Sequence, residues 1–163
     1  MVDIVRRKGR ERKESDEYGT PIHIYNYFHS VFNFDMDVCA SKKNHKHENY
    51  ITIKQDALNP KTPWGKSNWC NPPYSNILPW YERAINEAET NRATTVFLSK
   101  WDHSTKHGQL ALKHFRKIYF IAERIKFEGA DQTCNFPCFI GILRPRELFV
   151  LGDKFFSFSM RDL

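Results

Sequence analysis

Apolar residues along the chain recur at two different spacings. Between Ile77 and Asn91 they lie three or four residues apart, which places them on one face of an α-helix and predicts an amphipathic helix there. The same spacing predicts helices over 22–32 and 105–115. Pro21 precedes the first of these helices, and proline suits a first helical turn because no backbone donor is needed at that position.

Short runs of β-branched and aromatic residues, with alternating or continuous apolar character, predict strands. The segment 41–49 is rich in Lys, His and Asn and predicts a loop. From residue 67 onward strands alternate with helices, which is the pattern of βαβ units, so we expect a largely parallel sheet with both faces covered. The aromatic residues of 145–163 predict an edge strand or hairpin. The other predicted strands cover residues 34–39, 50–53, 67–70, 94–98, 117–122 and 139–143.

The composition fits one folded domain. The 163 residues are 40% hydrophobic and 15% aromatic, which is enough for a real core, so we expect residues 18–163 to form a single α/β domain. No apolar run is long enough to span a bilayer, so we expect no membrane segment and a cytoplasmic protein. Four irregularly spaced cysteines favour reduced thiols. Cys134 and Cys138 lack a paired Cys or His partner arrangement, so we expect no metal site.

The positive charge is concentrated near the N-terminus. The chain carries a net charge of +6, and basic residues dominate the segment 6–13. Such a block repels itself and commonly meets a polyanion, so we expect residues 1–17 to be a disordered basic arm. A solvated tail that only aids solubility is the alternative interpretation. The basic residues singled out here are Arg6, Arg7, Lys8 and Arg10.

The most informative stretch is Asn71-Pro72-Pro73-Tyr74, between a predicted strand and a predicted helix. Ligands of open α/β sheets bind at the carboxyl ends of the strands, where this stretch lies. The Asn71 side-chain oxygen and the Pro72 carbonyl are acceptors suited to both hydrogens of an exocyclic amino group, and Tyr74 offers a flat face to a planar ring. The alternative is a turn stiffened by proline, with Tyr74 packed in the core.

These four residues match the N-P-P-Y signature of S-adenosylmethionine-dependent amino-methyltransferases. More specifically, the chain resembles the phage-type DNA N6-adenine methyltransferases from residue 18 to about residue 145. The resemblance implies a Rossmann-like methyltransferase sheet with helices on both faces. It also implies an abbreviated fold near the first strands, where the 41–49 loop is too short for a crossover helix. The matching segments, in order, are Thr20-Pro21, Asp37 to Ser41, Asp56 to Leu58, Trp69 to Tyr74 and Arg124 to Phe127.

The resemblance also implies a mechanism. A target adenine in DNA is flipped out of the duplex, because its amino group is unreachable inside it. Asn71 and the Pro72 carbonyl then accept the N6 hydrogens, Pro73 stiffens the turn, and Tyr74 stacks on the base. A second aromatic residue, Phe127 or Phe136, closes the other face.

For the cofactor, S-adenosylmethionine, the resemblance assigns contacts to three segments. Thr20 and its neighbours hold the methionine carboxylate, Asp37 meets the ammonium or an ordered water beside it, and Asp56 approaches the nucleoside end. For both aspartates the alternative is an ordinary loop residue that caps a turn. The predicted cofactor contacts are Tyr18, Thr20, Pro21, Asp37, Cys39, Ala40, Ser41 and Asp56.

For the DNA, the resemblance implies phosphate contacts by the basic arm and a substrate-facing loop after the 94–98 strand. Trp101 and Asp102 lie in that loop, although Asp102 fits equally well as the N-cap of the next helix. The resemblance places the protein in the cytoplasm of a bacterial host.

Three other functions remain open at this point. One is methylation of a different amine: adenine in RNA, cytosine N4 or a protein glutamine. Another is a degenerate methyltransferase fold that binds DNA or a host protein without catalysis, which the glycine-free turn at 39–41 leaves open. The third is a basic interaction module in which the arm does all the binding.

Overall fold

The computed structural model describes residues 14–145 and 154–163. None of the helices in these two ranges is long and apolar enough to cross a membrane. Short 3₁₀ helices begin and end the described structure: η1 (Glu14–Glu17) and η2 (Met160–Asp162). The α-helices are α1 (Ile22–Phe32), α2 (Leu78–Thr90) and α3 (Lys106–His114). The strands are β1 (Met36–Asp37), β2 (Ser67–Cys70), β3 (Thr94–Lys100), β4 (Lys117–Ile121), β5 (Cys138–Leu143) and β6 (Phe155–Phe158).

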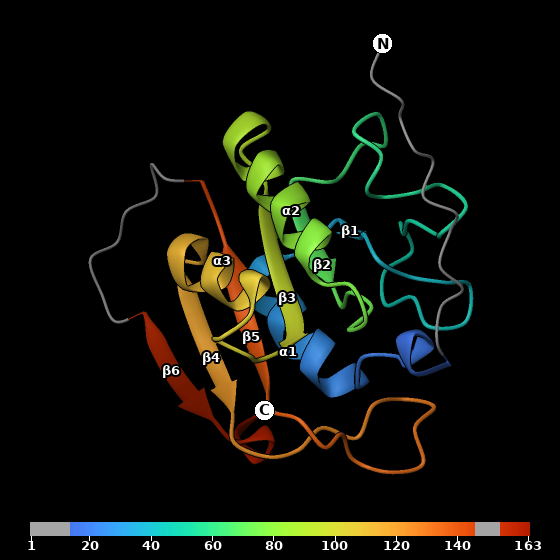
Figure 1. Cartoon of the computed structure of the whole chain (residues 1–163). Helices are drawn as coiled ribbons and strands as arrows, with labels where there is room; N and C mark the ends of the chain where they lie inside the picture. The colour runs from blue at the N-terminus through green and yellow to red at the C-terminus, as the bar shows by residue number, and fades with distance from the viewer. Residues whose placement is uncertain (1–13, 146–153) are drawn as a thin grey trace.

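One sheet organises the molecule, with its strands in the order β1-β2-β3-β5-β4-β6 (Figure 1). Strand β5 runs antiparallel to both of its neighbours, β3 and β4, and every other neighbouring pair is parallel. The largely parallel sheet predicted from the sequence is therefore confirmed, with β5 as the exception. The predicted edge strand near the C-terminus is β6, which lies beside β4.

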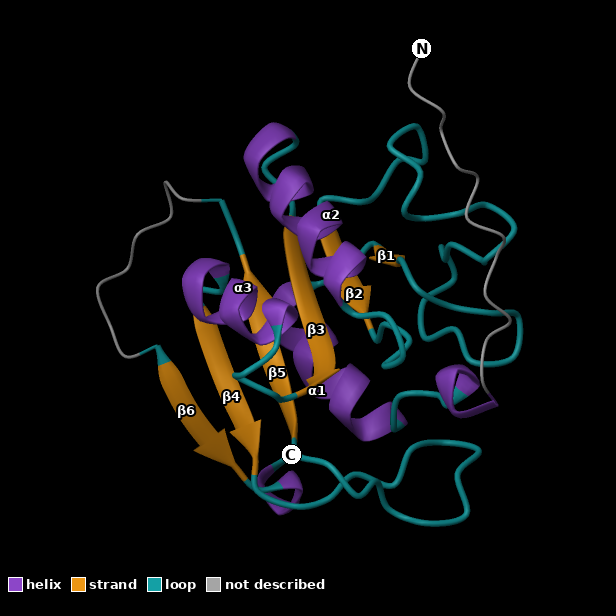
Figure 2. Cartoon of the chain, in the orientation of Figure 1, coloured by secondary structure: helices purple, strands orange, loops and turns teal. Residues whose placement is uncertain are grey.

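Helices cover both faces of the sheet (Figure 2), as predicted. On one face α1 buries Ile24, Tyr25 and Phe28 against the sheet. On the other face α2 and α3 pack together, with Tyr81 and Ala111 among their buried residues. The bounds of all three helices agree with the predicted segments to within a residue or two at each end, because the apolar spacing that predicts them is the spacing of their buried faces.

Strand β3 shows why a continuous apolar run forms a central strand. Its side chains alternate between the two faces, so Val96 and Leu98 join the core under α1 while Phe97 joins the core under α2 and α3. Gly141 of the adjacent β5 leaves room for the Phe115 ring, because a Cβ at that position would overlap it. Both faces of the sheet centre are thus buried, and they include a few polar side chains, such as Thr95 and Ser99 of β3.

The first crossover is abbreviated, as predicted, but one of the predicted strands is absent. The segment 50–53 makes a single parallel bridge, between Tyr50 and Asp37, and then turns. The prediction fails because the chain turns at Thr52, whose carbonyl accepts the backbone N–H groups of Gln55 and Asp56 at 3.0 and 3.2 Å. Strand β1 is likewise shorter than the predicted 34–39.

A buried arginine holds this helix-free crossover against α2. Arg83 pairs with Glu87 one turn along the helix, with 2.6 Å between nitrogen and oxygen. Its guanidinium also donates to the carbonyl oxygens of Asn59 and Thr62, at 2.7 and 2.8 Å. The fork geometry of arginine satisfies several acceptors at once, so one side chain fixes a long loop that has no regular structure of its own.

Candidate active site

The N-P-P-Y stretch forms the connection between β2, which ends at Cys70, and α2, which begins at Leu78. It therefore lies at the carboxyl edge of the parallel strands, where ligands bind in open α/β sheets. The backbone N–H of Asn76 donates to the Pro73 carbonyl at 3.0 Å and closes the turn. Neither proline can continue the β2 ladder, so the chain must leave the sheet directly after Cys70.

Two pockets flank this turn, and the residues of the turn divide between them. Pro72 and Tyr74 line the larger pocket, of about 460 Å³, whereas Pro73 and Ser75 line the smaller one, of about 200 Å³. Asp16 of η1 lines both. The turn thus contributes side chains to two neighbouring cavities.

Asn71 lies at the edge of the larger pocket, half-buried, with its amide orientation set by one hydrogen bond. Its Nδ2 donates to the carbonyl oxygen of Tyr18 at 3.3 Å. This bond uses the donor end of the amide, so Oδ1 remains available as an acceptor at a residue that lines the pocket. The neighbouring Pro72 carbonyl has no local N–H competing for it from Pro73, which lacks one.

Three aromatic rings form one side of the larger pocket. Tyr74 lies nearly perpendicular to Phe127, at a centroid distance of 5.7 Å, and to Phe136, at 5.4 Å. Both of the residues that the sequence offered as alternatives therefore lie beside Tyr74. Burial and the nearby Cys138 raise the pKa of the Tyr74 hydroxyl well above its usual value, so it stays neutral near pH 7. The hydroxyl reaches the Leu98 carbonyl at 3.5 Å.

The rest of the larger pocket is formed by the 130–135 loop, whose polar residues the sequence did not single out. Lys100, at the end of β3, places its ammonium 5.4 Å from the centroid of the Phe136 ring. A planar apolar wall, two acceptors and a nearby cation suit a planar, amine-bearing group attached to an anionic chain. The loop residues lining the pocket are Ala130, Asp131, Gln132, Thr133, Cys134 and Asn135.

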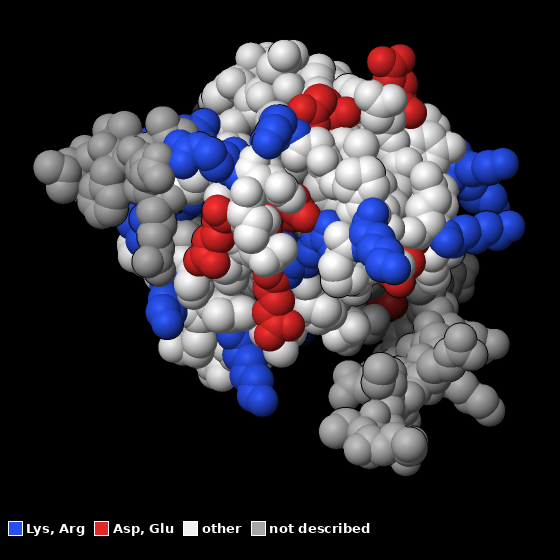
Figure 3. Space-filling model, turned by 90° about the horizontal axis from the view of Figure 1, so that it is seen from above, with Lys and Arg blue, Asp and Glu red and all other residues white. Residues whose placement is uncertain are grey.

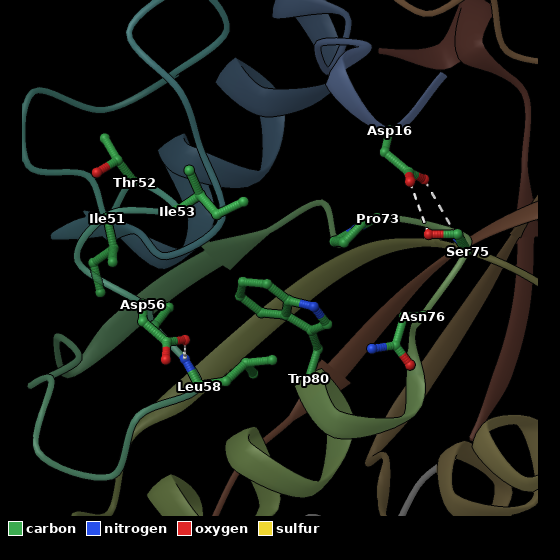
Figure 4. A pocket seen from close by; sticks show the side chains of 11 residues that line it. Asp16, Ile51, Thr52, Ile53, Asp56, Leu58, Pro73, Ser75, Asn76 and Trp80 are labelled. Carbon is green, nitrogen blue, oxygen red and sulfur yellow. Dashed lines mark hydrogen bonds between the residues drawn. The ribbon is translucent and has the colours of Figure 1, made fainter. Parts of the chain in front are cut away.

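Figure 4 shows the smaller pocket, in which the Trp80 side chain of α2 lies between Pro73 and the loop that carries Asp56. Ile51 and Leu58 add apolar surface to the same pocket. Asp56 adopts a left-handed backbone conformation (φ 54°), and its Oδ1 accepts the Leu58 N–H at 3.2 Å. Apolar walls together with the carboxylates of Asp16 and Asp56 fit a purine nucleoside, whose ring packs and whose hydroxyls donate.

The predicted contacts to the methionine part of a cofactor are not gathered at these pockets, apart from Tyr18, which lines the larger one. Thr20 is buried and accepts the indole N–H of Trp69 at 3.3 Å. Pro21 occupies the N-cap position of α1. Ser41 bonds to Asn44 through both its N–H and its hydroxyl, and Cys39 and Ala40 are buried. Cofactor contacts for these residues stay predictions.

Asp37 has a structural use of its own. Its side chain is 3% exposed, and its two oxygens accept the backbone N–H groups of Cys39 at 3.3 Å and Lys46 at 3.0 Å. Burial raises the pKa of this carboxyl to about 6, against the lowering effect of those hydrogen bonds and of nearby His45 and Lys46. The carboxylate therefore shapes the 37–46 loop, as the turn-capping alternative predicts, and lines neither pocket.

Trp101 and Asp102 also lie outside both pockets. Trp101 packs edge-on against Phe120 and Phe139, at centroid distances of 5.0 and 5.1 Å. Asp102 accepts from the N–H and hydroxyl of Ser104, at 3.1 and 2.6 Å, and these bonds lower its pKa. The N-cap alternative for Asp102 is wrong, since Thr105 caps α3 by accepting the Gly108 N–H at 3.1 Å.

The predicted arm falls largely outside the described residues, and so do Arg6, Arg7, Lys8 and Arg10. Its last residues, 14–17, belong to the folded structure instead, because they form η1. Asp16 there accepts from both the N–H and the hydroxyl of Ser75, at 3.3 and 2.7 Å. The sequence does not reveal this role, because Asp16 sits in a charged stretch without apolar periodicity.

Charges elsewhere on the surface are mixed. Over the described part of the face shown in Figure 3, Lys and Arg side chains project singly between Asp and Glu side chains. Figure 3 views the molecule from above its orientation in Figure 1. In Figure 1 the β4 and β6 arrows point downward, so the face shown in Figure 3 is not the one at the carboxyl ends of the parallel strands, where the N-P-P-Y turn lies. Within residues 14–145 and 154–163, no three His, Cys, Asp or Glu side chains are grouped to hold a metal ion.

Comparison with known proteins adds an independent line of evidence. A family model described as DNA N-6-adenine-methyltransferase (Dam) matches residues 8–138, a range that contains every residue lining either pocket. A DNA N-6-adenine-methyltransferase of Haemophilus phage HP1 (strain HP1c1) is 33% identical over 153 residues, which cover 88% of this chain and 87% of the relative. A DNA N-6-adenine-methyltransferase of Escherichia phage T1 is 30% identical over 109 residues, 65% of this chain and 44% of the relative.

Proposed function

Since the chain belongs to the DNA N-6-adenine-methyltransferase (Dam) family, we propose that it transfers a methyl group from S-adenosylmethionine to the N6 amino group of adenine in DNA. The observation that carries the proposal is the division of the N-P-P-Y turn between two pockets. Methyl transfer needs the acceptor nitrogen within about 3–3.5 Å of the donor methyl, and two pockets that are lined by the same turn and share Asp16 can hold a base and a cofactor next to each other.

The larger pocket takes the flipped adenine. Its volume of about 460 Å³ lies within the range of small-molecule sites, and it is lined by the acceptors of the turn and by aromatic rings. Asn71 Oδ1 and the Pro72 carbonyl accept the two N6 hydrogens, which draws the nitrogen lone pair out of the ring system. Asn71 is neutral, so it orients and polarises the amine but does not remove a proton.

The smaller pocket takes the nucleoside end of the cofactor. Ile51, Leu58 and Trp80 provide apolar surface for the purine, and Asp56 provides an acceptor for ribose hydroxyls. The cofactor, when bound, supplies an electrophilic methyl group. The protein contributes positioning, which can account for roughly 7–11 kcal/mol of a barrier when reactants are correctly held.

The basic segment of the arm, residues 6–13, precedes η1 in the chain, and Asp16 of η1 lines both pockets. We therefore assign this segment to DNA phosphates. Lys100 adds a cation beside Phe136, one of the residues that line the larger pocket. The relatives come from bacteriophages, so we expect the protein to act in the cytoplasm of a bacterial host.

Methyl transfer from labelled S-adenosylmethionine to separate pools of DNA, RNA and protein tests the acceptor. Label in DNA, recovered as N6-methyladenine, is the expected result. Label that appears only in RNA or protein, or as N4-methylcytosine, would show that the methyl acceptor is an amine other than adenine in DNA. Absence of both labelling and calorimetric cofactor binding would favour a catalytically degenerate binding protein.

A further inference from the structure

A short strap, residues 16–19, crosses the catalytic turn and contacts it at both ends. At one end the Asp16 carboxylate accepts from the N–H and the hydroxyl of Ser75, at 3.3 and 2.7 Å (Figure 4). At the other end the Tyr18 carbonyl accepts the side-chain N–H of Asn71 at 3.3 Å. The strap therefore spans the N-P-P-Y motif from its first residue to the residue that follows its last.

The bond to Tyr18 decides which way the Asn71 amide points. An asparagine side chain has one acceptor end and one donor end, and a fixed acceptor on the strap attracts the donor end. With the donor end held there, Oδ1 is left as the acceptor that this pocket-lining residue can offer. If the strap moved away, the amide would lose the one hydrogen bond that it makes within the described residues, and both orientations would become accessible.

The strap also reaches the aromatic loop. Gly19 and Glu128 exchange two backbone hydrogen bonds, at 3.0 and 2.9 Å. Glu128 directly follows Phe127, one of the rings beside Tyr74. A further bond, from Asn44 Nδ2 to the Glu17 carbonyl at 3.0 Å, joins the strap to the 37–46 loop. The strap thus connects the turn, the aromatic wall of the larger pocket and the first crossover.

We propose that Asp16 is a positioning residue for methyl transfer: it anchors the strap to Ser75 so that the Tyr18 carbonyl keeps Asn71 Oδ1 directed at the acceptor amine. Among the described residues that line the two pockets, only Asp16 belongs to both, which places the anchor beside the line of transfer. The inference rests on the proposed function. It assigns to Asp16 no contact with substrate or cofactor.

The test compares steady-state methylation by the full chain with Asp16→Ala, Asp16→Asn, Ser75→Ala and the double variant Asp16→Ala/Ser75→Ala. A misplacement of about 1 Å can cost on the order of 100-fold in rate, so we expect Asp16→Ala to lower kcat by roughly 10- to 100-fold with little change in either KM. Asp16→Asn keeps one acceptor oxygen and should fall between wild type and Asp16→Ala. The double variant should be no slower than Asp16→Ala, because both changes remove the same interaction.

Glu48→Ala is the matched control, since it removes an exposed carboxylate from the first crossover and should leave kcat unchanged. An increase in the KM for S-adenosylmethionine at unchanged kcat in Asp16→Ala would overturn the inference, because it would make Asp16 a cofactor contact. Wild-type kcat in both Asp16 variants would also overturn it while leaving the proposed function intact. An inactive wild-type chain would instead contradict the proposed function. If Asp16→Ala unfolds, Asp16→Asn and Ser75→Ala carry the same comparison.

Discussion

The Tyr74 ring lies edge-on to the Phe136 ring, with their planes at 77° and their centroids 5.4 Å apart. Phe127 meets Tyr74 in almost the same way, at 78° and 5.7 Å. Perpendicular contacts of this kind are favourable because the electropositive edge of one ring meets the electronegative face of another. The orientation of Tyr74 is therefore set by its neighbours before any base enters the pocket.

Removing the Tyr74 ring should weaken use of the DNA substrate. Stacking of a base on an aromatic side chain contributes about 1–3 kcal/mol, so Tyr74→Ala should lower kcat/KM for DNA by roughly 10- to 100-fold. Tyr74→Phe keeps the ring and loses the interactions of the hydroxyl with the Leu98 carbonyl and with Cys138, neither of which involves the base, so it should remain close to wild type. Steady-state methylation with varied DNA measures both, and equal losses in the two variants would argue against stacking.

Asn71→Ala should abolish methyl transfer and leave cofactor binding in place. The change removes the Oδ1 acceptor from the larger pocket, whereas the smaller pocket is lined by Pro73 and Ser75, on the other side of the turn. Calorimetric titration with S-adenosylmethionine should therefore give a Kd near that of the wild type. Retained methylation in this variant would refute the role assigned to Asn71.

Asp56→Asn and Asp56→Ala separate charge from backbone geometry in the smaller pocket. Asparagine tolerates the left-handed conformation (φ 54°) and can still accept the Leu58 N–H, so Asp56→Asn should fold normally and bind S-adenosylmethionine more weakly. Asp56→Ala should in addition lower the free energy of unfolding by about 1–2 kcal/mol, because alanine pays for a positive φ. Calorimetry and urea titration measure the two effects; unchanged cofactor affinity in Asp56→Asn would remove Asp56 from the site.

Stability should depend on pH through Asp37. The carboxyl has a pKa of about 6 in the fold and an ordinary value of 3.8, so between these values the native state holds a proton that the unfolded state has lost. The contribution of Asp37 is fully present below about pH 4 and is lost as pH rises to about 6, by at most about 3 kcal/mol. Carboxyl groups elsewhere, whose pKa values are lowered by folding, change the stability with pH in the opposite direction. The test is therefore the difference in free energy of unfolding between wild type and Asp37→Asn.

Urea unfolding of wild type and Asp37→Asn at a series of pH values isolates this contribution. The difference in free energy of unfolding between the two proteins should change steadily between pH 4 and pH 6, in the direction that makes wild type relatively less stable at the higher pH. A difference that is constant over this range would contradict the raised pKa of Asp37.

Local sequence patterns predict the parts of this fold that local energetics decide. The 77–91 helix and the position of N-P-P-Y at a strand end both follow from residues within a dozen positions. The antiparallel direction of β5 cannot be predicted in this way, because the apolar pattern of residues 139–143 is the same for a parallel and an antiparallel strand. The 50–53 segment has strand-forming residues, yet the chain turns within it, where the Thr52 carbonyl accepts the N–H groups of Gln55 and Asp56.

The site shows the same limit. Tyr74 and a second ring, Phe127 or Phe136, are predicted from the N-P-P-Y motif and the family resemblance, whereas Asp16 and Trp80 reach the pockets through chain packing alone. Asp37 and Asp102 show the converse case: a carboxylate at a strand end can spend both oxygens on nearby N–H groups. Whether an aspartate accepts hydrogen bonds from backbone N–H groups or faces a ligand depends on the path of the backbone, which local sequence patterns do not predict.

The order in which the turn serves the two pockets also restricts its length. From Pro72 to Ser75 successive residues line opposite pockets, whereas Asn71 lines the larger pocket and Asn76 the smaller one. Inserting or deleting one residue after Pro72 would move the stacking tyrosine by one place in this order without changing any side chain. The motif is therefore constrained in length as well as in composition.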